Sequence, residues 1–200
     1  MKHITDNEMK LMLTIFKNPR IEYNSNNISK VLGISRMGCL KIAKKLERER
    51  IIILKQMGKA KFFSLDLSKD YVKNYVSFLL KIEAEQSTSY VRVWVNELRN
   101  KITKAKIIIL FGSVLKKEKE ANDIDVMFVT TQKNFEKLKK EVESINLISY
   151  KRIHPLYQGL QDLKDNLRKN DPVILNVING IIVSGAEELV ELIKDESNKK

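Results

Sequence analysis

The sequence predicts an α+β protein of two domains, and three observations carry this prediction. Apolar residues recur at helical spacing near the N-terminus and then at a spacing near two around residue 55, which indicates helices followed by a hairpin. A second set of strongly apolar segments begins after Lys106. The 200 residues are 43% hydrophobic and 31% charged, a balance that supports buried cores and argues against disorder. Two compact domains fit this length.

The composition excludes several classes of protein. The longest uncharged apolar run, Ile107–Phe111, is far shorter than the roughly 20 residues of a membrane-spanning helix. No apolar stretch typical of a signal peptide follows the N-terminus. One cysteine, Cys39, cannot form an internal disulfide, and two histidines are too few for a Cys/His zinc site. We therefore expect a cytoplasmic protein that does not contact membranes.

Positive charge is concentrated near the N-terminus. The formal net charge is +12 and the sequence pI is about 9.6. Residues 1–67 carry a net charge of +8, and residues 68–200 carry +4. Clustered Lys and Arg bind polyanions because they release counterions from phosphates. The first third of the chain therefore indicates a nucleic-acid partner, with general solubility as the alternative interpretation.

Three short helices are expected in the first 50 residues. The first begins at Asp6 and ends before Pro19, because proline cannot continue a helix. The second starts after Asn27 and stops at Gly33. The third begins at Ser35, whose hydroxyl is a favourable N-cap.

A β-hairpin is expected after these helices. Residues 51–54 and 61–65 are β-prone, and a turn containing Gly58 separates them. Two helices, a Gly-containing turn, a third helix and a hairpin resemble a winged helix-turn-helix. The tract ISKVLGISRMGCLKIAKKLERERII is similar to the DNA-binding domains of many prokaryotic transcription regulators. This resemblance covers residues 1–67 and implies double-stranded DNA as a partner, whereas a protein-interaction module is the alternative.

The third helix and the hairpin carry the candidate DNA contacts. Cys39, Ala43 and Leu46 share one apolar stripe, so the basic residues near the helix start face outward. In the resembling fold this helix enters the major groove, and the hairpin contacts phosphates. A solvated basic face is the alternative. The residues expected to contact DNA are Ser35, Arg36, Met37, Lys41, Lys44, Lys55, Lys59 and Lys61.

Residues 68–104 are expected to form a helical connector. Apolar and aromatic residues recur at helical spacing on both sides of a polar stretch at residues 83–89. One long helix or two helices fit this pattern, with Ser87 or Ser89 as the cap of the second. The aromatic residues suit either a homodimer surface or ordinary packing against the second domain.

The pattern that carries chemistry lies between residues 107 and 129. Asp123 and Asp125 open an apolar run, and residues i and i+2 of a strand point to the same face. Two neighbouring carboxylates repel each other unless a cation lies between them, and Mg²⁺ prefers oxygen ligands. Gly112 lets the backbone approach a phosphate, and Ser113 can donate a hydrogen bond to it. A helix starting at Val114 directs its N–H groups at the same anion.

The stretch KIIILFGSVLKKEKEANDIDVMFVTT resembles the polymerase-beta-like nucleotidyltransferase superfamily, in which Gly-Ser follows one strand and Asp-x-Asp begins the next. The resemblance extends from Lys106 to Ser184. It implies a small mixed α/β fold that transfers a nucleotide from a nucleoside triphosphate to an acceptor hydroxyl. The implied roles are phosphate binding by Gly112, Ser113, Lys116 and Lys117, and catalysis and binding of Mg²⁺ or Mn²⁺ by Asp123 and Asp125.

The chain also departs from this family. Two-metal members use a third carboxylate on a later strand, but the strand expected at that place, residues 147–153, contains no acid. Glu143 precedes this segment and Asp162 follows it. His154 and Pro155 are expected to form a turn. Nucleotide binding with one metal is therefore better supported than catalysis, and a binding-only domain stays open.

The remaining residues complete an α+β arrangement. Asp171 is expected to cap a helix over residues 173–179, a strand follows at 181–183, and a last helix follows Gly185. We therefore expect a winged helix-turn-helix at 1–67, a helical connector at 68–104 and a nucleotidyltransferase-like domain at 105–200.

Two functional hypotheses follow. In the first, a DNA-binding transcription regulator has a second domain that binds Mg–nucleoside triphosphate, with or without transfer of the nucleotide. In the second, a nucleotidyltransferase modifies a nucleic-acid or protein (toxin-like) acceptor, and the winged helix recruits it. A protein-interaction module in which both sites are inactive is a third interpretation.

Overall fold

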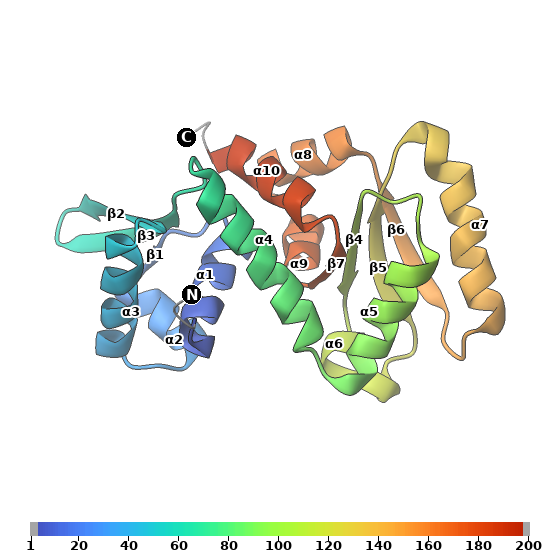
Figure 1. Ribbon diagram of the computed structural model, residues 1–200, viewed down its shortest axis with the longest axis horizontal. Helices are drawn as coiled ribbons and strands as arrows, with labels where there is room; N and C mark the ends of the chain where they lie inside the picture. The colour runs from blue at the N-terminus through green and yellow to red at the C-terminus, as the bar shows by residue number, and fades with distance from the viewer. Residues whose placement is uncertain (1–3, 198–200) are drawn as a thin grey trace. The chain divides into compact units, whose positions relative to one another are not determined.

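The structure is a computed structural model that describes residues 4–197 (Figure 1). Within these residues the chain is α+β, with ten α-helices and two small sheets. It divides into two compact units, Met1–Leu79 (unit 1) and Leu80–Lys200 (unit 2), and the boundary falls within α4 (Asp70–Glu85). None of the helices in the described range has the length and apolar character needed to cross a membrane.

Unit 1 combines three helices with a three-stranded antiparallel sheet of order β1-β3-β2. It also contains the first part of α4. Its other elements, in chain order, are α1 (Asp6–Lys17), β1 (Tyr23–Asn24), α2 (Ser25–Leu32), α3 (Arg36–Arg48), β2 (Ile52–Met57) and β3 (Ala60–Leu65).

The helix starts in unit 1 are set by side-chain caps. The N–H of Gly38 donates to the Ser35 hydroxyl at 3.0 Å, so the predicted cap of α3 is confirmed. Helix α2 begins three residues earlier than predicted, because the carboxamide oxygen of Asn24 accepts the N–H groups of Asn26 and Asn27. The strand β1, which pairs with β3, was not predicted; its two residues are too few for a periodic signal.

Unit 2 is built on a four-stranded sheet of order β6-β5-β4-β7, in which β5 and β6 are parallel and the other pairs are antiparallel. Its elements after α4 are α5 (Ser89–Lys101), β4 (Ile107–Phe111), α6 (Val114–Lys117), the 3-10 helix η1 (Glu118–Glu120), β5 (Ile124–Val129), α7 (Gln132–Ile148), β6 (Ile153–Gln158), α8 (Leu160–Arg168), α9 (Pro172–Ile178), β7 (Ile181–Ser184) and α10 (Ala186–Ser197).

The core of unit 2 determines which face of the sheet is left for a site. Ile124, Val126 and Phe128 of β5 are fully buried in a cluster with residues of α5 and α7. Because side chains alternate along a strand, Asp125 points to the opposite face. The start of β5 therefore presents a carboxylate on the face that α5 and α7 do not cover.

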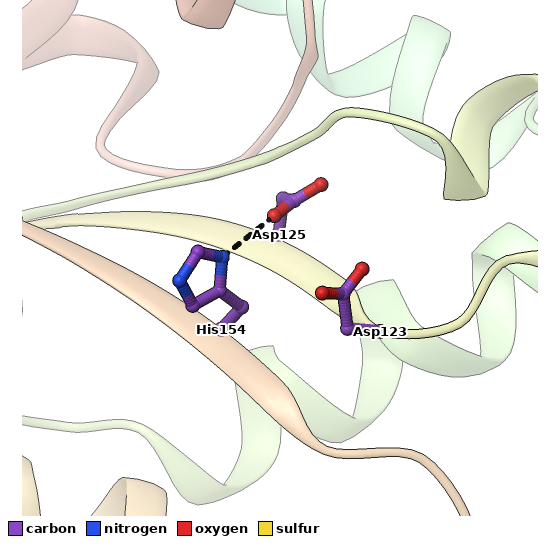
Figure 2. A group of neighbouring side chains, drawn as sticks. All are labelled: Asp123, Asp125 and His154. Carbon is purple, nitrogen blue, oxygen red and sulfur yellow. Dashed lines mark hydrogen bonds and ion pairs between the residues drawn. The ribbon is translucent and has the colours of Figure 1, made fainter.

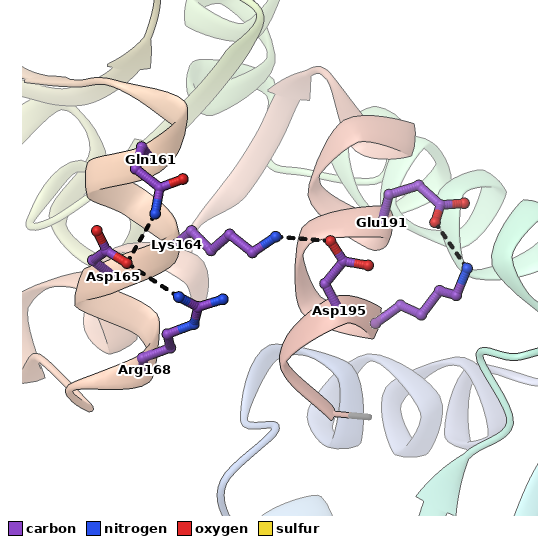
Figure 3. Close-up of polar contacts among 7 residues, drawn as sticks. Gln161, Lys164, Asp165, Arg168, Glu191 and Asp195 are labelled. Carbon is purple, nitrogen blue, oxygen red and sulfur yellow. Dashed lines mark hydrogen bonds and ion pairs between the residues drawn. The ribbon is translucent and has the colours of Figure 1, made fainter. Parts of the chain in front are cut away.

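Ion pairs join helices on the C-terminal side of unit 2 (Figure 3). Lys164 of α8 lies 2.8 Å from Asp195 of α10, and Asp165 accepts hydrogen bonds from Gln161 and Arg168 on its own helix. Lys194 and Glu191 pair within α10. All of these pairs are partly exposed, so each contributes on the order of 1 kcal/mol or less.

The connector consists of two helices, α4 and α5, rather than one. The prediction that Ser87 or Ser89 caps the second helix is wrong. The N-cap position is Thr88, which makes no side-chain cap bond, and the Ser87 hydroxyl donates instead to Ala84 O at the end of α4.

Two predictions around residue 150 are also wrong. Leu147 and Ile148 belong to α7, because its buried stripe continues at helical spacing to Ile145. The next strand, β6, therefore begins only at Ile153. His154 and Pro155 lie in this strand, not in a turn, and Pro155 is tolerated because β6 is at the edge of the sheet.

The predicted cap of α9 is confirmed. The carboxylate of Asp171 accepts the N–H groups of Val173 and Ile174, and Pro172 occupies the first helical position. Proline is favourable at this position because its missing N–H would have no helical partner.

Candidate functional site

The two predicted aspartates lie at the start of β5. Asp123 directly precedes the strand and Asp125 is its second residue, while Ile124 between them is buried. Ligand atoms of Asp123, Asp125 and His154 all lie within 4.8 Å of one another. Figure 2 shows these three side chains gathered at the start of β5 and β6. The spacing of the sequence pattern therefore brings the two carboxylates together as expected.

Gly112 lies directly against one of these carboxylates. Phe111, the last residue of β4, pairs with Asp125 in the antiparallel ladder, and Gly112 follows with a φ of +80°. A Cβ added at Gly112 would lie 2.0 Å from Oδ2 of Asp125. The position thus requires glycine for two reasons, the left-handed backbone and the space that the carboxylate occupies.

The other predicted nucleotide-binding residues lie around α6. Ser113 precedes this short helix, and its carbonyl oxygen accepts the N–H groups of Lys116 and Lys117. Both lysine side chains are exposed and form no ion pair within the described part of the chain. The structure places them after Gly112 and Ser113 but does not bring them into contact with the aspartates.

His154 is the residue that sequence reasoning missed. In the parallel pairing of β5 and β6 it lies opposite Asp125, and its Nδ1 is 3.1 Å from Oδ1 of Asp125 (Figure 2). The His154 side chain is 73% exposed and that of Asp125 is 22% exposed. A signal existed in the sequence: the helical stripe through Leu138, Val142 and Ile145 moves the following strand downstream, onto His154.

Backbone contacts hold the segment that leads into Asp123. The ammonium group of Lys151 donates to the carbonyl oxygens of Lys119 and Ala121. The N–H of Ile124 donates to Arg152 O at 2.9 Å. These bonds connect the loop before β5 to the loop before β6, so the two loops that lead into the strands of the cluster are fixed to each other.

The donor set of the cluster fits a divalent metal ion. Two carboxylates this close together repel each other without a cation, and carboxylate oxygens and imidazole nitrogens are both common metal ligands. The residues present therefore suit the Mg²⁺ or Mn²⁺ that the sequence pattern predicts.

Two hollows occur elsewhere in unit 2. One of about 490 Å³ is mostly apolar, and one of about 270 Å³ lies at the carboxyl ends of β5 and β6. Neither is lined by a residue of the Asp123, Asp125 and His154 cluster. The first is lined by Tyr90, Val93, Trp94, Glu97, Lys119, Ser149, Tyr150 and Lys151, and the second by Thr130, Thr131, Gln132, Phe135, Tyr157, Gln158, Gly159 and Asp162.

In unit 1, α3 and the β2–β3 hairpin present an exposed basic surface. The inward stripe of α3 is confirmed, since Cys39, Ala43 and Leu46 are at most 1% exposed. Met37, on the outer side, is 63% exposed, and Ser35 is exposed although its hydroxyl serves as the cap. The cations of this surface, hereafter the basic surface, form no ion pair within residues 4–197: Arg36, Lys41, Lys44, Lys55, Lys59 and Lys61.

Neighbouring Lys45 shows the contrast. Its ammonium group pairs with Glu8 of α1 at 2.5 Å, so this lysine serves the packing of α3 against α1. Within residues 4–197 the cations of the basic surface have no such carboxylate partner.

No protein-family model, curated protein or solved structure matches this chain.

Proposed function

We propose that this chain is a DNA-binding protein whose unit 2 binds a metal–nucleoside triphosphate and transfers the nucleotide to an acceptor. The observation that carries the proposal is the pairing of Asp123 and Asp125 at the start of β5, with the backbone of Gly112 directly against Asp125. Paired carboxylates beside a half-buried glycine-serine turn suit a triphosphate with its cation.

The finer assignment of the fold is part of this proposal. In unit 1 the order of three helices followed by a hairpin supports a winged helix-turn-helix. In unit 2 the sequence β4, Gly112-Ser113 and antiparallel β5 supports a polymerase-beta-like nucleotidyltransferase arrangement.

Each residue of the site has a chemical role in this proposal. Asp123 and Asp125 hold Mg²⁺ or Mn²⁺, which when bound neutralises charge on the phosphates during transfer. Gly112 lets the triphosphate approach the backbone, and the Ser113 hydroxyl donates to a phosphate oxygen. The exposed Lys116 and Lys117 add positive charge beside the turn.

The basic surface supports double-stranded DNA as the partner of unit 1. Its cations lie on the helix and the hairpin expected to contact DNA, and none is neutralised by a carboxylate of the described chain. Phosphate contacts by such residues supply most of non-specific affinity. The simplest joint role is regulation of transcription by a protein that also binds nucleotide.

The second candidate function uses the same site, but catalysis at that site is the main activity of the chain. Here the chain is primarily an enzyme that modifies a nucleic-acid or protein acceptor, and unit 1 recruits the acceptor. The exposed side chain of His154 favours it, because an acceptor can reach the cluster from solvent on that side, where Asp125 is partly exposed.

One experiment tests the proposal and separates the two functions. Wild type is incubated with α-labelled ATP, CTP, GTP or UTP, Mg²⁺ or Mn²⁺, and duplex DNA, tRNA or the protein alone. We expect label transfer that Asp123→Asn/Asp125→Asn abolishes. The matched control is Glu120→Gln, which removes the charge of an exposed carboxylate that has no partner in the described chain.

The identity of the labelled acceptor decides between the functions. Label on tRNA or on the protein favours the enzyme with a recruiting unit. Equilibrium dialysis of the same nucleotides completes the experiment. Nucleotide bound without transfer would reduce unit 2 to a binding domain, and absence of both binding and transfer would reject the proposed role of the site.

A further inference from the structure

We propose that His154 is a third ligand of the metal held by Asp123 and Asp125, and that it makes the site select a first-row transition-metal ion such as Mn²⁺ over Mg²⁺. This inference rests on the proposed function only in that the same two aspartates hold the metal. It names a metal preference that the two carboxylates alone would not produce.

The separation of the donor atoms suits ligands of one ion. Nδ1 of His154 lies 3.1 Å from Oδ1 of Asp125. Two neighbouring ligands of an octahedral ion, each about 2.1 Å from it, are about 3.0 Å apart, and two opposite ligands are about 4.2 Å apart. The donor atoms of all three residues lie within 4.8 Å of one another, close to this range. Small side-chain rotations are enough to bring them to a common centre.

The backbone holds His154 in this place. Its strand pairs with β5 along six consecutive residues, from Ile124 opposite Ile153 to Val129 opposite Gln158. The residue before it is fixed as well, because the N–H of Ile153 donates to Oδ1 of Asn146 at 2.7 Å. A ligand on a paired strand is more precisely placed than one on a free loop. The strand pairing therefore fixes the backbone position of His154 beside the two aspartates.

The chemistry of imidazole gives the preference. Carboxylate and water oxygens are the ligands that suit Mg²⁺, whereas an imidazole nitrogen suits the transition metals. Mn²⁺ accepts both kinds of ligand, so a site of two carboxylates and one imidazole favours it. The competing explanation is that His154 only hydrogen-bonds to Asp125, which would leave Nδ1 protonated and unable to bind a metal.

The test measures metal binding by the full chain without nucleotide. Mn²⁺ and Mg²⁺ are titrated by calorimetry, and pulsed electron paramagnetic resonance of bound Mn²⁺ detects coupling to a nitrogen nucleus. The only other histidine, His3, is replaced by Ala in every sample so that a histidine coupling reports His154 alone. The chain with this substitution alone serves as the wild type of this test. We expect Mn²⁺ to bind more tightly than Mg²⁺ by about tenfold or more, with nitrogen coupling present.

Three variants separate ligation from hydrogen bonding. His154→Gln retains a side chain that can hydrogen-bond to Asp125, and we expect it to lose the nitrogen coupling and the preference for Mn²⁺. His154→Ala should lose both as well, and His154→Asp should bind Mg²⁺ and Mn²⁺ through oxygen ligands only. A thermal melt of each variant checks the fold.

The outcomes distinguish this inference from the proposed function. Wild type without nitrogen coupling, or an unchanged metal preference in His154→Gln, overturns the role of His154 even if Mg–nucleotide binds and the label is transferred. If neither metal binds to wild type, both this inference and the proposed metal site are rejected. Loss of the preference in the Gln and Ala variants supports the inference whatever the outcome of the transfer assay.

Discussion

At the scale of single residues, the position of Asp125 depends on the absence of a side chain at Gly112. The space that a Cβ would fill is taken by the Asp125 carboxylate, and the φ of +80° is unfavourable for any other residue. The position of the Asp125 side chain therefore depends on glycine at position 112.

We predict that Gly112→Ala weakens Mn²⁺ binding by about tenfold, because the new Cβ displaces the carboxylate of Asp125. Strain at the left-handed backbone should also lower the free energy of unfolding by about 1–2 kcal/mol. Calorimetric titration with Mn²⁺ and a urea melt measure the two effects.

The control is Gly33→Ala, at a φ of +65° with open space around its Cβ position. Gly33→Ala should lower the free energy of unfolding through backbone strain and leave the affinity for Mn²⁺ unchanged. Equal metal affinities for Gly112→Ala and wild type would show that the close approach of Gly112 to Asp125 does not matter for the site.

A second prediction at this scale concerns Lys151, whose ammonium group bonds to two carbonyl oxygens before Asp123. Lys151→Met should lower the free energy of unfolding by about 1.5–3 kcal/mol, the range for hydrogen bonds of charged groups. Amides of residues 118–123 should exchange faster with deuterium. Lys116→Met, an exposed lysine with no partner in the described chain, should change neither quantity; similar effects of the two substitutions would contradict a specific role of Lys151.

At the scale of elements, α1 and α3 are joined by the ion pair of Glu8 and Lys45. Burial of Glu8 opposes ionisation, but the hydrogen bonds from Lys45 and Thr5 outweigh it and hold the pKa of Glu8 below its ordinary 4.5. The hydrogen bond to Glu8 in turn raises the pKa of Lys45. The ion pair therefore stabilises unit 1 at pH values between the lowered pKa of Glu8 and the raised pKa of Lys45.

We predict that Glu8→Gln lowers the free energy of unfolding at pH 7 by about 1 kcal/mol, since the amide keeps the cap at Thr5 but loses the charge. A lowered carboxyl pKa contributes stability above the ordinary value of 4.5, and this contribution is lost as the pH falls through the lowered pKa. Urea melts of wild type and variant should accordingly converge in acid. A difference that stays constant as the pH falls below 4.5 would rule out the charge as its cause.

The basic surface is the second feature at this scale, and it gives a prediction for DNA. Lys41→Ala and Lys55→Ala should each weaken binding to duplex DNA and reduce the slope of log affinity against log salt by about 0.9. The control, Lys10→Ala, removes an exposed lysine of α1, outside this surface. Fluorescence anisotropy over a series of salt concentrations measures both values, and equal slopes for all four proteins would contradict the role of the surface.

At the scale of the whole molecule, the proposed DNA-binding surface and the proposed metal site lie in different units. The basic surface lies in Met1–Leu79, and the Asp123, Asp125 and His154 cluster lies in Leu80–Lys200. We predict that Mn²⁺ with ATP slows deuterium exchange around residues 111–125, whereas duplex DNA slows it in α3 and the hairpin. Asp123→Asn/Asp125→Asn should remove the first effect and leave the second. Protection of the hairpin by nucleotide alone would show that the two functions are not divided in this way.

Much of the chain could be predicted from local patterns. The period of the apolar residues predicted α1, α3 and the hairpin, because an element that buries one face imposes its period on the sequence. Continuous apolar runs predicted β4 and β5, which are buried on both faces. The caps at Ser35 and Asp171 were equally readable, since they depend on residues within one turn. The resemblances to a winged helix-turn-helix and to a nucleotidyltransferase remain predictions.

The pair of carboxylates follows from local sequence, because Asp123 and Asp125 are two residues apart and their common face follows from strand geometry. The residues that lie beside this pair depend on contacts between distant segments. Pairing between strands is not local, so the parallel register that brings His154 opposite Asp125 could not be derived from spacing along the chain. The close approach of Gly112 likewise depends on how β4 meets β5, across a stretch of chain that no periodic pattern spans.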